Sequence, residues 1–390
     1  MIRSTLLQLT AVSLCSTSMV YAAEPVGIPM GGFELYPVVM VNVSHDDNIF
    51  AQEKVKKSSV LTTINPGLKV VLAHGTNEYS AEYYLAKGFY QSSSSDNFLD
   101  HIATVSADLN LSSRLSSQLQ LNYNKKHDPR GSTFTGSPLS FKTPDLYHEV
   151  AANGKVSYGI NARIAFQGDY SLKRYDNHQT VTQSRDMDML GGDVTFYYPI
   201  ASKSSAFIEA RYKRFDYKQT VSTLDSNEQR LYVGLEWEAT AKTTGSARFG
   251  YLKKKFVAAT QKTGSNFSWE VGVLWEPLSY SSWDISSSSG SVESDGTGSY
   301  TQTTNGSLTW NHEWSSSLSH TALISYTQSK YKGVVKARTD NLTTAGLTLN
   351  YELNRWLIMN GGYTYTSRRS NAVNSSFQQN LWSLGFKAAI

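Results

Sequence analysis

The chain has 390 residues, a formal net charge of +4, and 24 Tyr, 15 Phe and 8 Trp. Its only cysteine, Cys15, lies close to the N-terminus, which excludes disulfides and thiol chemistry from the rest of the chain. A soluble chain of this length normally divides into domains joined by linkers, and no linker is visible. No segment after the first twenty-odd residues approaches the run of about 18 apolar residues that a membrane helix needs. If the chain crosses a membrane, it therefore crosses as a β-barrel.

The N-terminus has the pattern of a secretory signal peptide. Arg3 precedes an uncharged, mostly apolar stretch over residues 6–19, and small residues follow at Ala22 and Ala23. We predict a signal peptide over residues 1–22, with cleavage after Ala22. Acylation of Cys15 as a lipoprotein is disfavoured, because Leu14 stands where a small residue is required.

The remaining chain shows segments in which apolar and polar residues alternate, as barrel strands between lipid and a wet lumen require. In one of them Leu231, Val233 and Leu235 alternate with Arg230, Tyr232, Gly234 and Glu236. We predict a short periplasmic segment at 23–32 and an all-β, antiparallel transmembrane barrel of about eighteen strands over 33–390. The strands are expected near residues 33, 59, 77, 98, 116, 146, 162, 187, 205, 229, 244, 266, 280, 299, 318, 341, 355 and 378.

Short and long connections alternate along the chain, as expected for periplasmic turns and extracellular loops. The short links fall at 74–77, 112–114, 159–161, 240–243 and 353–355. The longer polar links fall at 44–57, 125–144, 175–185, 218–227, 289–298 and 331–340. Only about ten residues separate Ala23 from the first strand, too few for a folded plug, so any narrowing of the lumen must come from the loops.

Alternation also predicts which polar side chains line the pore. Both signs of charge occur among them, which suits a hydrated polar solute such as a glycan, and Tyr84 and Tyr232 are placed to stack on sugar rings. A generic wet wall is the alternative. The predicted pore-lining residues are Glu82, Tyr84, Gln120, Asn122, Arg163, Gln167, Glu209, Arg211, Arg230, Tyr232, Glu236, Arg248 and Glu270.

Clusters of Lys and Arg fall at the predicted outer ends of strands. Such a basic extracellular mouth binds the phosphates of lipopolysaccharide, or it guides an anionic polymer through the exit. Its predicted residues are Lys125, Lys126, Lys213, Arg214, Lys253, Lys254, Lys255, Arg368 and Arg369.

The C-terminus alternates up to the last residue through Trp382, Leu384, Phe386, Ala388 and Ile390. This pattern resembles the assembly signal of outer-membrane proteins and implies the barrel assembly machinery as a partner. The signal most often ends in Phe, whereas this chain ends in Ile390 and has its Phe four positions earlier.

The stretch 37–50, PVVMVNVSHDDNIF, invites a metal or catalytic interpretation, because His45, Asp46 and Asp47 are adjacent. Neighbouring strand residues point to opposite faces and no third ligand is identifiable, so a strand end followed by a turn is favoured. A strand containing Pro37 followed by D-D-N-I-F resembles the β-barrel porins encoded with exopolysaccharide clusters, the VpsM-like or EpsL-like barrels. The resemblance implies export of a matrix polysaccharide, together with a periplasmic polysaccharide export protein and an inner-membrane co-polymerase.

Three functional classes follow: a conduit for exopolysaccharide, a nutrient or general diffusion porin, and a barrel enzyme. The conduit is favoured, the porin is the alternative, and the enzyme is disfavoured because no spacing singles out a nucleophile and its base. No catalytic residue, metal, cofactor or nucleic-acid partner is predicted. The expected location is the outer membrane of a Gram-negative bacterium.

Overall fold

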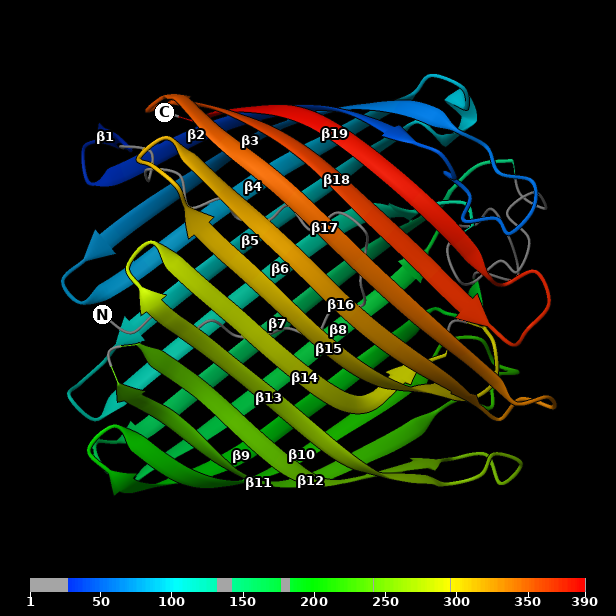
Figure 1. Cartoon of the computed structure of the whole chain (residues 1–390). Coiled ribbons are helices and arrows are strands. Elements are labelled where there is room, and N and C mark those ends of the chain that lie inside the picture. Colours follow the sequence, from blue (N-terminus) through cyan, green and yellow to red (C-terminus); the bar gives the residue numbers. More distant parts are fainter. Residues whose placement is uncertain (1–26, 132–141, 177–182, 241, 295, 390) are drawn as a thin grey trace.

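The computed structural model describes residues 27–131, 142–176, 183–240, 242–294 and 296–389. Within them the chain forms a closed barrel of eighteen antiparallel strands, β2–β19, which confirms the predicted fold (Figure 1). The predicted signal peptide and Ile390 lie outside the described residues. In the part described, no helix has the length and apolar character needed to cross a membrane.

The strands begin within a few residues of the predicted positions, because each starts where alternation resumes after a turn. A short strand, β1 (Ile28–Met30), pairs with β2 at the rim. The barrel strands are β2 (Phe33–Asp46), β3 (Ser59–His74), β4 (Asn77–Tyr90), β5 (Phe98–Asn110), β6 (Leu115–Asp128), β7 (Asp145–Gly159), β8 (Arg163–Tyr175), β9 (Met187–Ala201), β10 (Ser204–Tyr217), β11 (Ser226–Thr240), β12 (Thr243–Phe256), β13 (Gly264–Leu278), β14 (Ser281–Glu293), β15 (Tyr300–Glu313), β16 (Leu318–Lys332), β17 (Arg338–Asn354), β18 (Leu357–Ser370) and β19 (Phe377–Ala389). A single turn of 3₁₀ helix, η1 (Ser94–Asp96), lies between β4 and β5.

Most barrel strands present a mainly apolar face outward and a polar face inward. On β11 the outward Leu231 and Val233 are 55% and 59% exposed, whereas the inward Tyr232 between them is 0% exposed. The apolar surface of this chain therefore lies on the outside of the barrel, where a bilayer would cover it. The interior holds the polar and charged side chains.

Turn lengths differ between the two rims of the barrel, and we name them the short-turn rim and the long-loop rim. The β3–β4 link has only two residues, and its Gly75 has φ of +63°, a conformation that glycine adopts without strain. At the opposite rim strands extend further than expected. In particular, β14 continues to Glu293, into the segment 289–298 that alternation had assigned to a loop.

The barrel closes where β19 pairs with β2, and the D-D-N-I-F segment clasps this seam at the long-loop rim. Asp47 accepts hydrogen bonds from the backbone N–H and the side-chain amide of Asn380, at 2.8 and 2.7 Å. Asn48 is fully buried and donates to the carbonyl oxygens of Gln52 and Gln378, at 2.8 and 2.9 Å. The segment thus ties the first barrel strand to the last. These hydrogen bonds explain why Asp and Asn side chains stand at positions 47 and 48.

Replacing Asn48 with Ala is expected to weaken the seam. The change removes both donated bonds and the bond that Asn48 Oδ1 accepts from Gln52 N (2.9 Å), leaving buried backbone groups without partners. We expect the free energy of unfolding to fall by about 2–3 kcal/mol. Urea-induced unfolding in lipid vesicles measures this. Asn77→Ala, which loses one exposed bond to Asn110 N, is the control; an equal loss in both variants would contradict the clasp.

Candidate functional site

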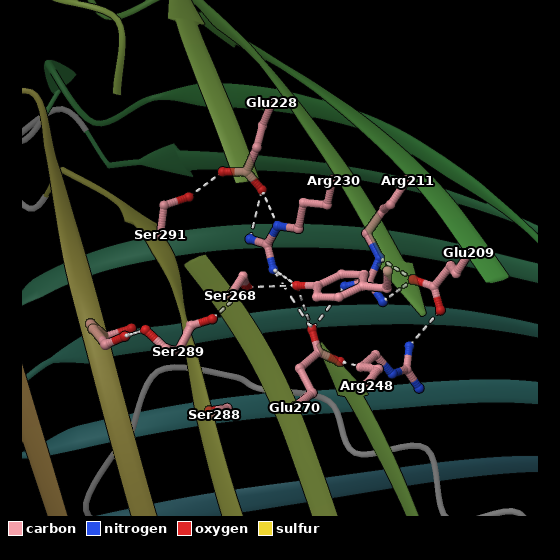
Figure 2. Close-up of polar contacts among 12 residues, drawn as sticks. Glu209, Arg211, Glu228, Arg230, Arg248, Ser268, Glu270, Ser288, Ser289 and Ser291 are labelled. Carbon is pink, nitrogen blue, oxygen red and sulfur yellow. Dashed lines mark hydrogen bonds and ion pairs between the residues drawn. The ribbon is translucent and has the colours of Figure 1, made fainter. Parts of the chain in front are cut away.

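The inward faces of four neighbouring strands, β10–β13, carry a connected group of charges, which we call the charged cluster (Figure 2). Residues two apart on a strand share a face, so consecutive inward positions of β10 and β11 bring their charges side by side. The cluster consists of Glu209, Arg211, Glu228, Arg230, Arg248 and Glu270.

Two of its glutamates each bridge several arginines. Glu209, which is 3% exposed, accepts from Arg211 Nη2 and from Arg248 Nη1, both at 2.6 Å. Glu270 lies 3.1 Å from Arg211, 3.6 Å from Arg248 and 3.7 Å from Arg230. Arg211 and Arg230 face each other in the β10–β11 register, and Glu270 offsets the repulsion between these like charges.

A tyrosine and a serine are enclosed beside these charges. Tyr232 Oη lies 2.7 Å from Ser268 Oγ, and its ring centre is 5.5 Å from the Arg211 guanidinium carbon. Ser268 Oγ in turn donates to the Ser289 carbonyl oxygen at 2.5 Å. Because Tyr232 is 0% exposed, the expectation that its ring stacks on a sugar is wrong.

The charged cluster balances its own charge, since it holds three arginines and three glutamates in mutual contact. Paired charges leave a weak net field in the lumen, and none of them is free to hold a passing ion tightly. A wall of this kind is polar and hydrated but has little preference for either sign of charge.

The part of the lumen that continues from the charged cluster, from β14 through β19 to β2, is lined by small uncharged polar side chains, and we call it the hydroxyl wall. Adjacent strands bring these side chains into rows, in which Ser286 Oγ lies 2.7 Å from Ser307 Oγ and Thr321 Oγ1 donates to Asn311 Oδ1 at 2.8 Å. Its inward charges, including Asp284 and Lys387, lie toward the ends of the strands. The two central rows are Ser286, Ser307, Ser325, Thr344 and Thr366, and Asn311, Thr321, Thr348, Ser383 and Ser44.

One hairpin end lies inside the lumen. Pairing between β13 and β14 stops at Trp269 and Ser289, although both strands continue, and in Figure 1 the far end of β14 curves away from β13. Beyond this point β14 pairs only with β15, and β15 pairs on its other side with β16. The in-folded hairpin, residues 290–294 and 296–303, therefore occupies part of the pore cross-section.

Contacts hold the in-folded hairpin against the inner surface of β10–β13. Glu293 forms an ion pair with Lys254 and accepts a hydrogen bond from Tyr217 Oη at 2.8 Å. Ser291 Oγ donates to Glu228, and the ring of Tyr300 lies 6.1 Å from that of Phe256. These contacts join the hairpin to the charged cluster, so the two form one constriction.

The predicted pore-lining residues fall into separate groups. Six of them meet in or beside the charged cluster: Glu209, Arg211, Arg230, Tyr232, Arg248 and Glu270. Arg163 and Glu236 form their own ion pair at 2.8 Å, and Gln167 donates to Asp169 at 3.1 Å. The others lie across the lumen on β4 and β6, away from the cluster: Glu82, Tyr84, Gln120 and Asn122.

Sequence reasoning missed several residues of the constriction. Glu228 shares the inward face with Arg230, and placing the start of that strand three residues earlier would have included it. The ion pair between Glu293 and Lys254 was not predicted, because Glu293 was assigned to a loop and Lys254 to the exposed basic mouth. The hydroxyl wall was not predicted, because alternation of apolar and polar residues does not single out small hydroxyl side chains as a group.

The predicted basic mouth is only partly exposed. Lys254 is 0% exposed and Lys213 points inward beside Gly191, so neither belongs to an outer basic surface. Arg368 also points inward, where its Nε donates to the Ser375 carbonyl oxygen at 2.6 Å. Lys125 and Lys126 are half-buried at the end of β6, and the exposed members are Arg214, Lys253, Lys255 and Arg369.

Two candidate motifs remain, the acidic stretch at residues 45–47 and the alternating C-terminal strand. Asp46 accepts from Gln379 at 2.7 Å, and the described residues contain no group of three or more His, Cys, Asp or Glu arranged to hold a metal. On β19, Trp382, Leu384 and Phe386 point outward and are 59%, 51% and 42% exposed.

Comparison with known proteins found a family and several solved structures that resemble this chain. Residues 21–390 match the family described as "Putative beta-barrel porin 2". The outer membrane protein OpdK from Pseudomonas aeruginosa shares 9% identity and a TM-score of 0.50, covering 92% of this chain and 99% of its own. OprD from the same organism has 11% identity and a TM-score of 0.46, covering 94% and 97%.

The FrpB iron transporter from Neisseria meningitidis has 11% identity and a TM-score of 0.45 over 86% of this chain. The present chain spans only 62% of the length of that protein. At these identities the likeness concerns the fold alone. No curated protein sequence matches the chain.

The closed barrel, its polar lumen and its apolar outer surface define a porin-like outer-membrane barrel. The family match over residues 21–390 shows that the chain belongs to this β-barrel porin family, which confirms the resemblance seen at D-D-N-I-F. The fold implies an outer-membrane location, with the short-turn rim in the periplasm and the long-loop rim outside.

Proposed function

We propose that the barrel is a conduit through which an exopolysaccharide leaves the cell. The observation that carries the proposal is the contrast between the two lumen walls: a wall of hydroxyl and amide groups continues from a wall whose charges neutralise one another. A sugar polymer presents many hydroxyl groups and must move along the lumen without binding tightly to its wall. Short, interchangeable donors and acceptors provide contacts that exchange readily with water, because each contributes little net free energy.

The family resemblance supports the same role and adds partners to the proposal. In this scheme a periplasmic polysaccharide export protein delivers the polymer to the short-turn rim, and an inner-membrane co-polymerase drives its synthesis. The barrel itself is passive, and polymer pushed from behind moves along the hydroxyl wall past the in-folded hairpin.

Blocking the hydroxyl wall is expected to stop secretion. Cys15 is the only native cysteine, so Ser325→Cys provides a unique target for a bulky, water-soluble maleimide in the mature chain. In cells whose chromosomal gene is deleted, we expect unlabelled Ser325→Cys to restore extracellular polysaccharide and labelling to abolish it. Polysaccharide is measured outside the cell and in the periplasm, with a parallel measurement of polymer synthesis.

Two cysteine variants serve as controls. Val335→Cys lies in the exposed β16–β17 loop and is labelled without entering the lumen, whereas Ile324→Cys points outward on the same strand as Ser325. Labelling of neither should change secretion. Continued secretion with complete labelling at position 325 would overturn the conduit.

A diffusion porin for small solutes is the second candidate, and the in-folded hairpin favours it. A loop or hairpin that narrows the lumen is what a porin needs to select solutes by size. If labelled Ser325→Cys lowers the uptake of a small solute but leaves polysaccharide secretion unchanged, the porin assignment replaces the conduit.

A further inference from the structure

The outward face of β8–β12 carries a band of positive charge at the long-loop rim, which we call the basic belt. Its cations are Arg174, Arg214, Lys218, Lys253 and Lys255. Arg174 and Lys218 both pair with Asp188, and Arg214 pairs with Asp216 at 2.9 Å. Lys253 and Lys255 on β12 are exposed and form no ion pair with any described residue. These two lysines thus provide positive charge that no ion pair neutralises, where the barrel wall leaves the apolar part of a bilayer.

Strand register places three of these cations close together. Arg214, Asn227 and Lys255 are directly opposite one another across β10, β11 and β12, and Lys253 lies one row further toward the middle of the barrel. Alternate strands are about 10 Å apart, so Arg214 and Lys255 are separated by about that distance. Two phosphate groups on one lipid headgroup can be equally far apart. Tyr212 Oη donates to Asn227 Oδ1 at 2.7 Å, which leaves the Asn227 amide hydrogens available as donors.

An apolar groove lies directly below these cations on the same outward face. It has a volume of about 750 Å³, and its lining includes Phe166, Ala210, Tyr212, Tyr251 and, at its upper end, Lys253. In the β9–β10 register Gly192 lies opposite Tyr212 and Ala210 lies opposite Val194, and the small size of Gly192 and Ala210 leaves the depression between larger side chains. The groove is therefore apolar along its length and cationic at one end.

We propose that this face binds one molecule of lipopolysaccharide, with its phosphates on Arg214, Lys253 and Lys255 and an acyl chain in the groove below. The occupant must be amphipathic, because the site joins a cationic end to an apolar groove on a membrane-facing surface. It must also be anionic and reach the extracellular side. A phosphorylated glycolipid of the outer leaflet meets these conditions and carries more than one phosphate for the spaced cations. The inference is independent of what passes through the lumen.

Neutralising the three cations tests the headgroup part of the site. The wild-type barrel, extracted in mild detergent, is expected to retain lipopolysaccharide that native mass spectrometry and a phosphate assay detect, and Arg214→Gln/Lys253→Gln/Lys255→Gln should lose most of it. Lys203→Gln/Lys242→Gln/Arg355→Gln, which removes the same number of exposed charges at the short-turn rim, should retain it. Equal retention in both triple variants would overturn the site.

A second variant tests the groove without changing any charge. Ala210→Phe fills the groove and leaves the basic belt intact, so we expect several-fold weaker retention of lipopolysaccharide, while the delipidated wild type regains the lipid when it is added back. Persistence of the compact band of the folded barrel in unheated gel samples shows that each variant is folded. Unchanged retention by Ala210→Phe, or equal retention of phosphatidylglycerol from mixed vesicles, would contradict the proposed occupant.

Discussion

Shortening the in-folded hairpin is expected to raise the single-channel conductance of the barrel several-fold. Ser291 and Gln302 are cross-strand partners, so replacing residues 292–301 with two glycines joins them by a tight two-residue turn. The change removes Glu293 and Tyr300, which hold the hairpin against β10–β12. Conductance in planar bilayers measures the effect.

The control is an equivalent shortening of a loop that stays at the rim. Replacing residues 219–224 of the β10–β11 loop, where Val221 is 77% exposed, with two glycines should leave the conductance unchanged. If both shortened barrels conduct like the wild type, the hairpin does not constrict the pore. If the barrel is a conduit, secretion of polysaccharide should persist in the hairpin variant, because the polymer path widens.

Replacing Glu209 with Gln is expected to destabilise the barrel and to shift its ion selectivity toward anions. The carboxylate is nearly inaccessible and accepts from Arg211 and Arg248 at 2.6 Å, so its loss leaves two enclosed guanidinium groups short of negative charge. We expect the free energy of unfolding to fall by about 3 kcal/mol, as for other buried pairs that lose one partner. Urea-induced unfolding measures stability, and the reversal potential in a salt gradient measures selectivity.

Glu236→Gln is the matched control because it removes the same charge from an exposed pair. Glu236 and Arg163 are each 38% exposed and lie 2.8 Å apart, so solvent screens their interaction. A loss of less than about 1 kcal/mol is expected there. Equal losses at positions 209 and 236 would show that the charged cluster is no more tightly coupled than an ordinary surface pair.

The sequence by itself determined the class of fold and the position of nearly every strand. Alternation is a local property, because lipid on one side and water on the other act on successive residues of the same strand. It therefore identified Leu231, Val233 and Leu235 as outward, and placed Glu209 and Arg211 inward. It also located the short turns, since glycine and polar residues mark them directly in the chain.

Only the tertiary structure decided which inward residues meet and which are covered. Arg211 contacts Glu270 across two intervening strands, and Asp47 meets Asn380 only because the barrel closes. The sequence predicts that Lys254 belongs to an exposed basic cluster. In the structure β14 bends inward and places Glu293 beside Lys254. Alternation assigns a side chain to a face, whereas partners and burial depend on strand register, on barrel closure and on the bend that places one hairpin inside the lumen.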